Sequence, residues 1–122
     1  MAGDYSSIWI EGPYSASKGS VVELEVCIFN SYHGAINLTT TGKVNGTVLS
    51  LGSPKIVAAG RIESWYTSFV MPDKDMLVSV WSWYKGASGA WYVDDSITRE
   101  IELIAGPVVP DSEFRNLAVV VG

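Results

Sequence analysis

The feature that most constrains the fold of this chain is the alternation of apolar and polar residues along short segments that end at turn residues. It is clearest in residues 21–29, where apolar side chains occupy the even positions from Val22 to Ile28 while Glu23 and Glu25 occupy odd positions. Such a period of two places alternate side chains on opposite faces of an extended strand. No window of helical length carries an apolar stripe with a period of 3.6 residues. The sequence therefore predicts an all-β domain.

Seven or eight strands at the spacing of a β-sandwich follow from this pattern. The expected strands cover residues 5–11, 21–29, 35–44, 47–51, 61–71, 76–84, 90–94 and 98–104, with a short piece at 55–58. Between two of them lies Asn45-Gly46, a dipeptide suited to the positive φ angles of a type I′ turn. We therefore expect a hairpin at this position.

The size and charge of the chain make some functional classes more plausible than others. A chain of 122 residues is long enough for one hydrophobic core without disulfides. Its net charge of −5 and its scattered basic residues argue against a nucleic-acid binder, which would need clustered Lys and Arg. With 48% hydrophobic and only 17% charged residues, the folded surface should be fairly apolar, which is typical of a protein with a partner.

Membrane insertion and secretion are not expected. No run approaches the ~20 apolar residues that cross a bilayer, and the residues after Met1 lack the basic and apolar segments of a secretory signal. If Met1 is the native start, the chain is made in the cytosol.

Residues 67–80 carry a resemblance to a known group of modules. The segment Thr67-Ser68-Phe69-Val70-Met71-Pro72-Asp73-Lys74-Asp75-Met76-Leu77-Val78-Ser79-Val80 resembles the F-x-M-P-x-x-D-v-x-v turn of many immunoglobulin-like modules in bacterial and archaeal surface proteins and in phage structural proteins. Residues 19–26, followed by Asn30, also look like the second strand and turn of such modules. The resemblance implies an immunoglobulin-like antiparallel sandwich used as a spacer, adhesion unit or assembly decoration. It carries over no catalytic residues.

The residues of this turn can also be explained by their chemistry, without the resemblance. Met71 can close the core at the end of a strand, Pro72 fixes φ and prevents further pairing, and Asp73 or Asp75 can accept backbone N–H groups. Asp73 with Asp75, and Asp94 with Asp95, could alternatively supply oxygen ligands for calcium. Turn capping explains these pairs more simply, so we expect no metal and no cofactor.

The inventory of catalytic groups is poor. His33 and Cys27 are the single histidine and the single cysteine, and no P-loop, G-x-S-x-G or H-E-x-x-H motif is present. We expect Cys27 to point inward as a small buried hydrophobe and His33 to be solvated in a turn. An enzyme would need carboxylates such as Asp94 and Glu63 to meet in a cleft. The sequence therefore predicts a protein that is not an enzyme.

Aromatic residues are the main candidates for a binding surface. Three neighbouring predicted strands carry Trp65, Tyr66, Trp81, Trp83, Tyr84, Trp91 and Tyr92, and we expect these rings to cluster. In residues 76–84 the alternation assigns Met76 and Val78 to the core face and Trp81 and Trp83 to the outer face. We expect one or two tryptophans in the core and at least one in an interface. The predicted interface residues here are Trp81, Trp83, Trp91 and Tyr92.

The C-terminal residues are predicted to form a second kind of contact. Residues 1–104 make the expected sandwich domain, and residues 105–122 form a tail that contains two prolines and then an apolar, β-prone end. Leu117, Val119 and Val121 should dock as an extra strand, either on their own sandwich or on a neighbouring subunit.

Two functional hypotheses remain. The leading one is a virion subunit, such as a phage capsid decoration or accessory protein, that binds an assembly surface or like subunits; assembly in the cytosol and release by lysis would explain a surface-type sandwich without a secretion signal. The alternative is a carbohydrate-binding or cell-surface adhesion module. In that case Trp81, Trp83 or Trp91 would form a platform for sugar rings, with Asp94 or Asp95 as hydrogen-bond partners.

Overall fold

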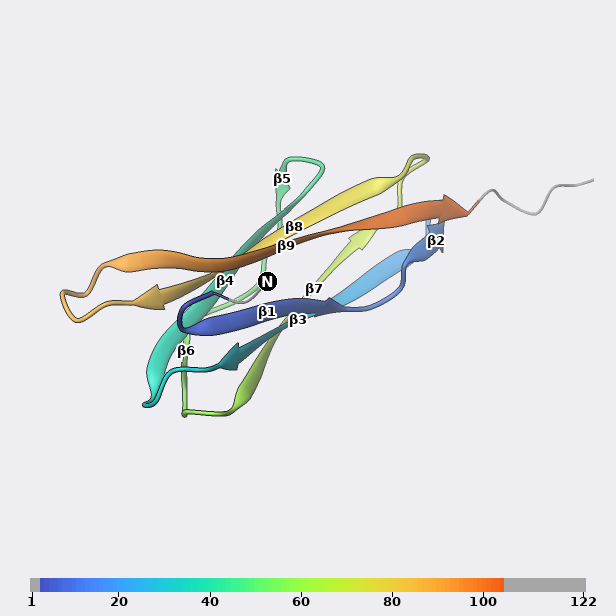
Figure 1. Cartoon of the computed structure of the whole chain (residues 1–122). Helices are drawn as coiled ribbons and strands as arrows, with labels where there is room; N and C mark the ends of the chain where they lie inside the picture. Colours follow the sequence, from blue (N-terminus) through green and yellow to red (C-terminus); the bar gives the residue numbers. More distant parts are fainter. Residues whose placement is uncertain (1–2, 105–122) are drawn as a thin grey trace, which may run out of the picture.

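A computed structural model describes residues 3–104, which form nine β-strands (Figure 1). The strands are β1 (Ser6–Glu11), β2 (Ser15–Ser17), β3 (Val21–Asn30), β4 (Ile36–Val44), β5 (Thr47–Val48), β6 (Lys55–Val57), β7 (Ile62–Val70), β8 (Met76–Lys85) and β9 (Trp91–Ile104). No helix in this part of the chain is long and apolar enough to cross a membrane. The all-β prediction is confirmed.

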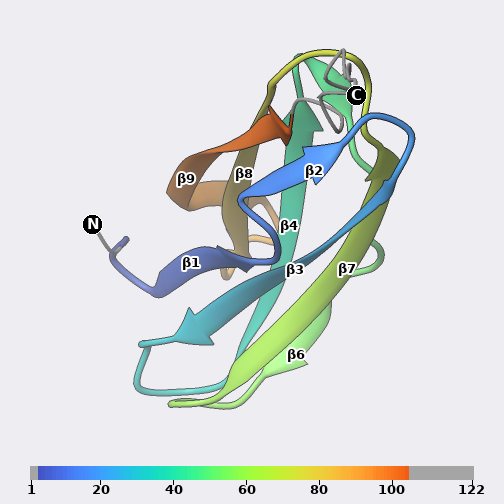
Figure 2. The ribbon, with the colours of Figure 1, turned by 90° about the vertical axis from the view of Figure 1, so that its right-hand side faces the viewer.

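Two sheets build the molecule. One has three strands in the order β1-β3-β7, and the other has the order β2-β9-β8-β4-β5 with β6 also paired to β4. Figure 2 shows β3 and β7 in front of β4 and β8, so that the sheets form two layers. All pairings are antiparallel except that of β2 with β9. Several neighbours, such as β3 with β7 and β4 with β8, are therefore strands that lie far apart in the sequence.

The core lies between the layers and follows the alternation of the sequence. On β3, the even-numbered residues from Val22 to Ile28 are at most 2% exposed, and on β8 Val78 and Val80 are fully buried. Trp65 of β7 is 2% exposed and adds the largest side chain to this core. Removal of these apolar surfaces from water is the main force that holds the two sheets together.

The predicted hairpin at Asn45-Gly46 is confirmed. Asn45 has φ +47° and Gly46 has φ +85°, and β4 pairs with β5 across this turn. The second strand is shorter than predicted, since it ends at Val48. Leu49 and Leu51 instead turn into the core, where they are 8% and 7% exposed.

The last strand differs from the prediction. We expected separate strands at 90–94 and 98–104, but β9 runs unbroken over Trp91–Ile104 along β8. The prediction ended one strand at Asp94 and left residues 95–97 as the connection to the next. The strand instead continues through a β-bulge, in which Asp94 is the extra residue between two pairs of the ladder. The prediction also missed β2, because three residues with two serines carry too little pattern.

Asp94 and Asp95 fasten the edge of β1 to β9. The Asp94 carboxylate accepts hydrogen bonds from the backbone N–H of Tyr5 at 3.1 Å and from the Ser6 hydroxyl at 2.6 Å. The Asp95 carboxylate accepts the backbone N–H of Ile8 at 2.9 Å. Because the bulge changes the direction of the side chains, two consecutive residues can both reach β1. These bonds satisfy donors of a strand edge that would otherwise be open.

Arg99 closes the same seam further along. Its guanidinium donates to the backbone oxygen of Ile10 at 2.8 Å and to that of Gly12, and it lies 3.7 Å from the ring of Tyr14. Side chains from β9 therefore join the two sheets along the whole length of β1.

Candidate functional site

The outer face of the six-stranded sheet carries the predicted tryptophans of β8. Trp81 and Trp83 alternate with the buried Val80 and Ser82, so they point away from the core as expected. In the sheet register, Trp81 lies between Thr41 of β4 and Ser96 of β9. Tryptophan rings and small hydroxyl side chains therefore share this face. We call it the tryptophan face and define it by Trp81, Trp83, Trp91, Thr39, Thr41, Val93 and Ser96.

The rings of the tryptophan face lie against the sheet. Trp81 and Trp83 are only partly exposed although no described element covers this face. The indole N–H of Trp83 donates to the hydroxyl of Thr41 at 2.8 Å, which draws the ring toward β4. Rings held in this way present flat apolar surfaces with hydroxyl groups at their sides. Such a surface can bury a partner without a large loss of side-chain freedom.

Trp91 and Tyr92 lie on opposite faces of β9. Trp91 is paired with Lys85, and Lys85 lies on the same side of β8 as Trp83. Trp91 therefore belongs to the tryptophan face. Tyr92 is paired with Tyr84 on the other side of the strands, and their ring centres are 5.6 Å apart. The predicted interface residue Tyr92 thus lies apart from the three tryptophans.

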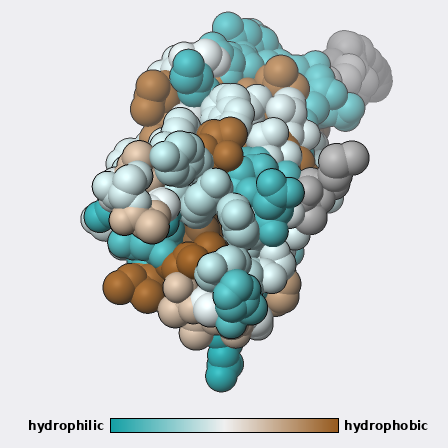
Figure 3. Space-filling view, turned by 60° about the vertical axis from the view of Figure 1, so that its left-hand side comes forward, coloured by the Kyte–Doolittle hydropathy of each residue, from teal (hydrophilic) through white to brown (hydrophobic). Residues whose placement is uncertain are grey.

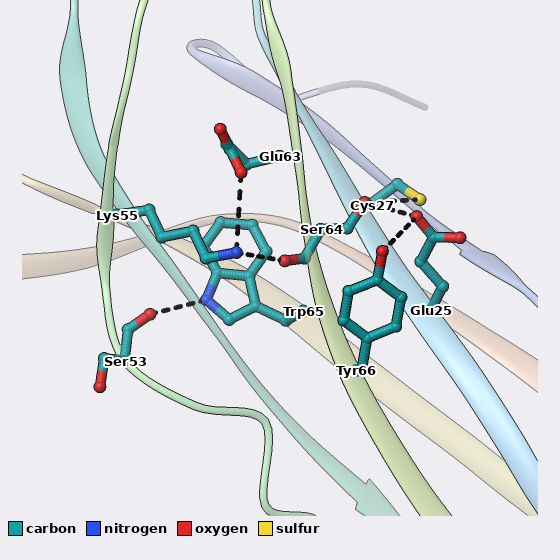
Figure 4. A network of polar contacts seen from close by, with 8 residues as sticks. All are labelled: Glu25, Cys27, Ser53, Lys55, Glu63, Ser64, Trp65 and Tyr66. Carbon is teal, nitrogen blue, oxygen red and sulfur yellow. Dashed lines mark hydrogen bonds and ion pairs between the residues drawn. The ribbon is translucent and has the colours of Figure 1, made fainter.

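Trp65 and Tyr66 do not join the cluster that the sequence predicted. They lie on β7, which belongs to the three-stranded sheet and is not a neighbour of β8 or β9. Trp65 is in the core, where its indole N–H donates to the Ser53 carbonyl at 2.8 Å (Figure 4). Tyr66 is 68% exposed on the far side of the molecule. The prediction assumed that strands close in sequence are close in the sheet, and the crossover to the other layer overturns it.

Four of the carboxylates that we considered for metal binding or catalysis have structural partners. Asp94 and Asp95 bind the backbone of β1, and Asp75 accepts the backbone N–H of Leu103 at 2.7 Å. Glu63 lies in the other sheet from Asp94 and pairs with Lys55 at 3.6 Å. Within residues 3–104 no group of three or more His, Cys, Asp or Glu could hold a metal ion.

Cys27 is buried, but it does not face the core between the sheets. It lies on the outer side of the three-stranded sheet, between Trp9 and Ser64 in the register, and is 4% exposed. Figure 4 shows the Ser64 hydroxyl between Cys27 and Glu25, and it donates to the Glu25 carboxylate at 2.6 Å. Burial raises the pKa of the Cys27 thiol, and the nearby negative charge of Glu25 adds to this effect. The group is therefore a protonated thiol and a poor nucleophile at neutral pH.

His33 is exposed in the turn after β3, as predicted, and stacks against Tyr32 with ring centres 4.1 Å apart. Tyr32 in turn contacts Tyr5, which contacts Tyr84. The sequence analysis did not find this group of tyrosines. Because its members come from the start of the chain, the turn after β3 and the end of β8, no local pattern could have revealed it.

An open hollow of about 1000 Å³ lies on the other side of the molecule. Its lining includes the carboxylates of Glu11, Glu23 and Glu25 together with Tyr66 and Val48. Among the described residues, no His, Cys, Lys or Arg lines it.

The remaining predicted interface residues, Leu117, Val119 and Val121, lie outside the described residues, as does the whole predicted tail 105–122.

Comparisons with known proteins identify the fold. No protein-family model matches the sequence, and no curated protein matches it. Among solved structures, the chain is similar to the CARDB domain of the PF1109 protein from Pyrococcus furiosus, which was solved in complex with di-metal ions. The sequence identity is 11% and the TM-score 0.66, over 84% of this chain and 94% of that one. The fold is an immunoglobulin-like β-sandwich.

Two larger proteins contain a similar sandwich. One is the alkylpurine DNA glycosylase AlkC of Pseudomonas fluorescens, bound to DNA containing an abasic site analog, with 14% identity and a TM-score of 0.51 over 78% of this chain. The other is beta-glucuronidase 2 of Bacteroides uniformis, covalently bound to cyclophellitol-6-carboxylate aziridine, with 15% identity and a TM-score of 0.50 over 83% of this chain. The chain spans 30% and 13% of these proteins. Likeness at such low identity concerns the fold alone.

Proposed function

We propose that this chain is a non-catalytic binding module whose tryptophan face docks on the surface of a protein assembly. The observation that carries the proposal is the placement of Trp81, Trp83 and Trp91 on one face of a sheet that no described element covers and whose opposite face is the core. A monomeric domain has no internal need for three indole rings there. Aromatic residues are enriched in protein interfaces, where they supply much of the binding energy.

The chemistry of the tryptophan face supports a protein partner. Its side chains are aromatic, aliphatic or hydroxyl-bearing, which is the composition of an interface centre from which charge is depleted. Exposed charges such as Lys43 and Glu100 lie beside it on the same strands, as in a polar rim. Figure 3 brings forward the side of the molecule with the β8–β9 hairpin, where small apolar groups lie among pale residues of intermediate hydropathy and teal hydrophilic ones.

A virion is the specific assembly that we propose, with the chain as a capsid decoration or accessory subunit. The support comes from the sequence, namely the resemblance of residues 67–80 to phage structural modules. The open six-stranded sheet is compatible with lateral contact to a shell of other subunits.

The proposal can be tested with a photo-crosslinking amino acid on the tryptophan face. Ser96 is exposed and lies opposite Trp81. A benzoylphenylalanine at this position should therefore crosslink the chain to the shell proteins of purified virions. The same replacement at Ser68, exposed on the three-stranded sheet, is the matched control. The double variant Trp81→Ala/Trp83→Ala should lose the crosslink while its circular dichroism stays unchanged. Equal crosslinking from both positions, or none from position 96, would count against the proposal.

A carbohydrate ligand is the second candidate, because hydroxyl groups flank the rings. Thr39, Thr41 and Ser96 lie beside Trp81 and Trp83 in the register, and sugars bind through ring stacking combined with hydrogen bonds. Asp94 and Asp95, the acids that we considered as sugar ligands, instead bind β1. A glycan array distinguishes the candidates: binding that is lost in the double variant would favour a sugar, and a blank array together with a particle crosslink would favour a protein.

A further inference from the structure

A pocket of about 360 Å³ lies at the end of the sandwich, between the start of β1, the turn after β3 and the β8–β9 hairpin. The rings of Tyr5, Tyr32 and Tyr84 line it, and Ile36 adds an aliphatic wall. Tyr84 lies on the side of β8 opposite to Trp81 and Trp83, so the pocket is separate from the tryptophan face. Its volume suits a small molecule or a single side chain.

The three rings form steep walls around this pocket. Tyr5 contacts Tyr32 with ring centres 5.3 Å apart and an angle of 81° between the planes. It contacts Tyr84 at 4.7 Å and 67°. Because the ring planes of Tyr32 and Tyr84 are steeply inclined to that of Tyr5, the three rings enclose an angular recess and not a closed stack. The edge-to-face contacts also hold the rings in place before any ligand arrives.

The electrostatic surroundings of the recess are negative. The Asp94 carboxylate lies directly behind Tyr5 and accepts the backbone N–H groups of Tyr5 at 3.1 Å and of Asp4 at 2.9 Å. Partial desolvation raises the pKa of Tyr84 above its ordinary value, and the adjacent Tyr5 and the negative charges of Asp94 and Asp4 add to this rise. Lys85 is the one basic residue in the lining, and it is exposed. Its ammonium group can therefore extend into water while its methylene groups line the pocket.

We propose that this pocket binds an organic cation, such as a quaternary ammonium group. The faces of tyrosine rings carry negative electrostatic potential and attract a cation that lies over them. A quaternary ammonium has no N–H groups to satisfy, so it loses little hydration when it enters an aromatic recess. An anion would be repelled by the two carboxylates. The pocket lies outside the tryptophan face, so the proposal does not depend on the function argued above.

Choline and its uncharged isostere 3,3-dimethylbutan-1-ol provide the first test. The two molecules have the same shape, so only the positive charge differs. Titration into the full chain labelled with ¹⁵N, at constant ionic strength, should shift the amide signals of Tyr5, Tyr32 and Tyr84 with choline, and the isostere should bind at least about tenfold more weakly. Equal binding of the two would show a merely apolar recess and overturn the proposal, and so would an absence of shifts with millimolar choline.

Substitutions at Tyr84 and Lys85 provide the second test. Tyr84→Phe keeps the ring and should retain choline binding, whereas Tyr84→Leu should weaken it by about tenfold. Tyr66→Leu, an exposed tyrosine on the other sheet, is the matched control and should change nothing. Lys85→Glu should tighten binding, because it replaces a positive charge at the rim by a negative one. A loss of binding in Tyr84→Phe equal to that in Tyr84→Leu, or weaker binding in Lys85→Glu, would contradict a cation held by the rings.

Discussion

Trp65 and Trp81 carry the same side chain in opposite environments, and the face of the strand on which each lies decides the difference. Trp65 is 2% exposed and has its indole N–H satisfied by Ser53, so it combines apolar burial with a buried hydrogen bond. Trp81 lies on the outer face, partly exposed. The first residue therefore contributes to stability, and the second is free for the partner contact that we propose.

Trp65→Ala should destabilise the protein by about 3 to 5 kcal/mol, because it leaves a large cavity between the sheets. Trp81→Ala should lower the free energy of unfolding by about 1 kcal/mol or less, as is usual for a partly exposed site. Urea unfolding followed by circular dichroism measures both. A loss for Trp81→Ala as large as that for Trp65→Ala would contradict the division between core and contact residues.

Cys27 should make stability depend on pH in the alkaline range. Burial raises the pKa of its thiol above the ordinary value of 9.0, so the folded state keeps a proton that the unfolded state releases. Its contribution to stability is then complete below pH 9.0 and is lost as the pH rises through the folded-state pKa. The midpoint of urea unfolding should fall less steeply in this range for Cys27→Ala than for the unchanged chain. Identical slopes would show that the thiol titrates alike in both states.

At the scale of elements, turns and strand edges determine how the strands are paired and joined. The hairpin between β4 and β5 depends on positive φ at Asn45 and Gly46. Asn45 contributes further, since its side-chain oxygen accepts the backbone N–H of Leu77 at 2.7 Å. The other critical element is the edge of β1, which is joined to β9 by side chains instead of a backbone ladder. Local chemistry thus fixes how strands begin and where sheets close.

Gly46→Ala should destabilise the hairpin by about 1 to 2 kcal/mol, the usual penalty for an L-residue with left-handed backbone geometry. The added methyl group would meet nothing within 4 Å, so the loss comes from backbone conformation and not from a clash. Gly34→Ala is the control, because Gly34 lacks a positive φ and its new methyl group would make an ordinary contact with Tyr32 at 3.7 Å. Thermal unfolding of both variants measures the difference, and an equal effect would refute the assigned turn.

Asp95→Ala should loosen β1 at its edge. The substitution removes the acceptor of the Ile8 N–H and should lower stability by about 1 to 3 kcal/mol, the range for a hydrogen bond to a charged group. Hydrogen exchange of the Ile8 amide should become faster. Asp95→Asn keeps an oxygen at the same place and should show a smaller effect. If the exchange of Ile8 stays unchanged in Asp95→Ala, the side-chain seam does not hold this strand.

At the scale of the whole molecule, one core unites all the long-range pairings. The buried apolar cluster reaches from Ile8 on β1 to Ile101 on β9, so strands from both ends of the described chain complete the same interior. The tryptophan face and the tyrosine pocket lie on different parts of this single body. A rigid sandwich can therefore present two surfaces at a fixed distance from each other.

A chain that ends at residue 104 should keep the sandwich. Among the described residues, the buried cluster extends from Ile8 to Ile101, so removal of residues 105–122 should leave the β-type circular dichroism and cooperative urea unfolding intact. Light scattering on both lengths of the chain would measure any change in oligomeric state at the same time. A truncated chain that fails to fold would refute the domain boundary at residue 104.

The sequence by itself determined the fold class, most strand positions, the Asn45-Gly46 hairpin and the outward direction of Trp81 and Trp83. These features depend on local alternation and turn chemistry, which a single strand or turn carries without reference to the rest of the chain. The outer placement of Trp81 could be predicted because its neighbours in sequence are buried.

Only the tertiary structure decided which strands are neighbours. It moved Trp65 and Tyr66 to the other sheet and joined β9 into one strand through a bulge. It also brought together tyrosines from three distant segments. Strand order is set by how the apolar faces of the described strands can be buried at once. That is a property of the whole chain, and no single segment encodes it.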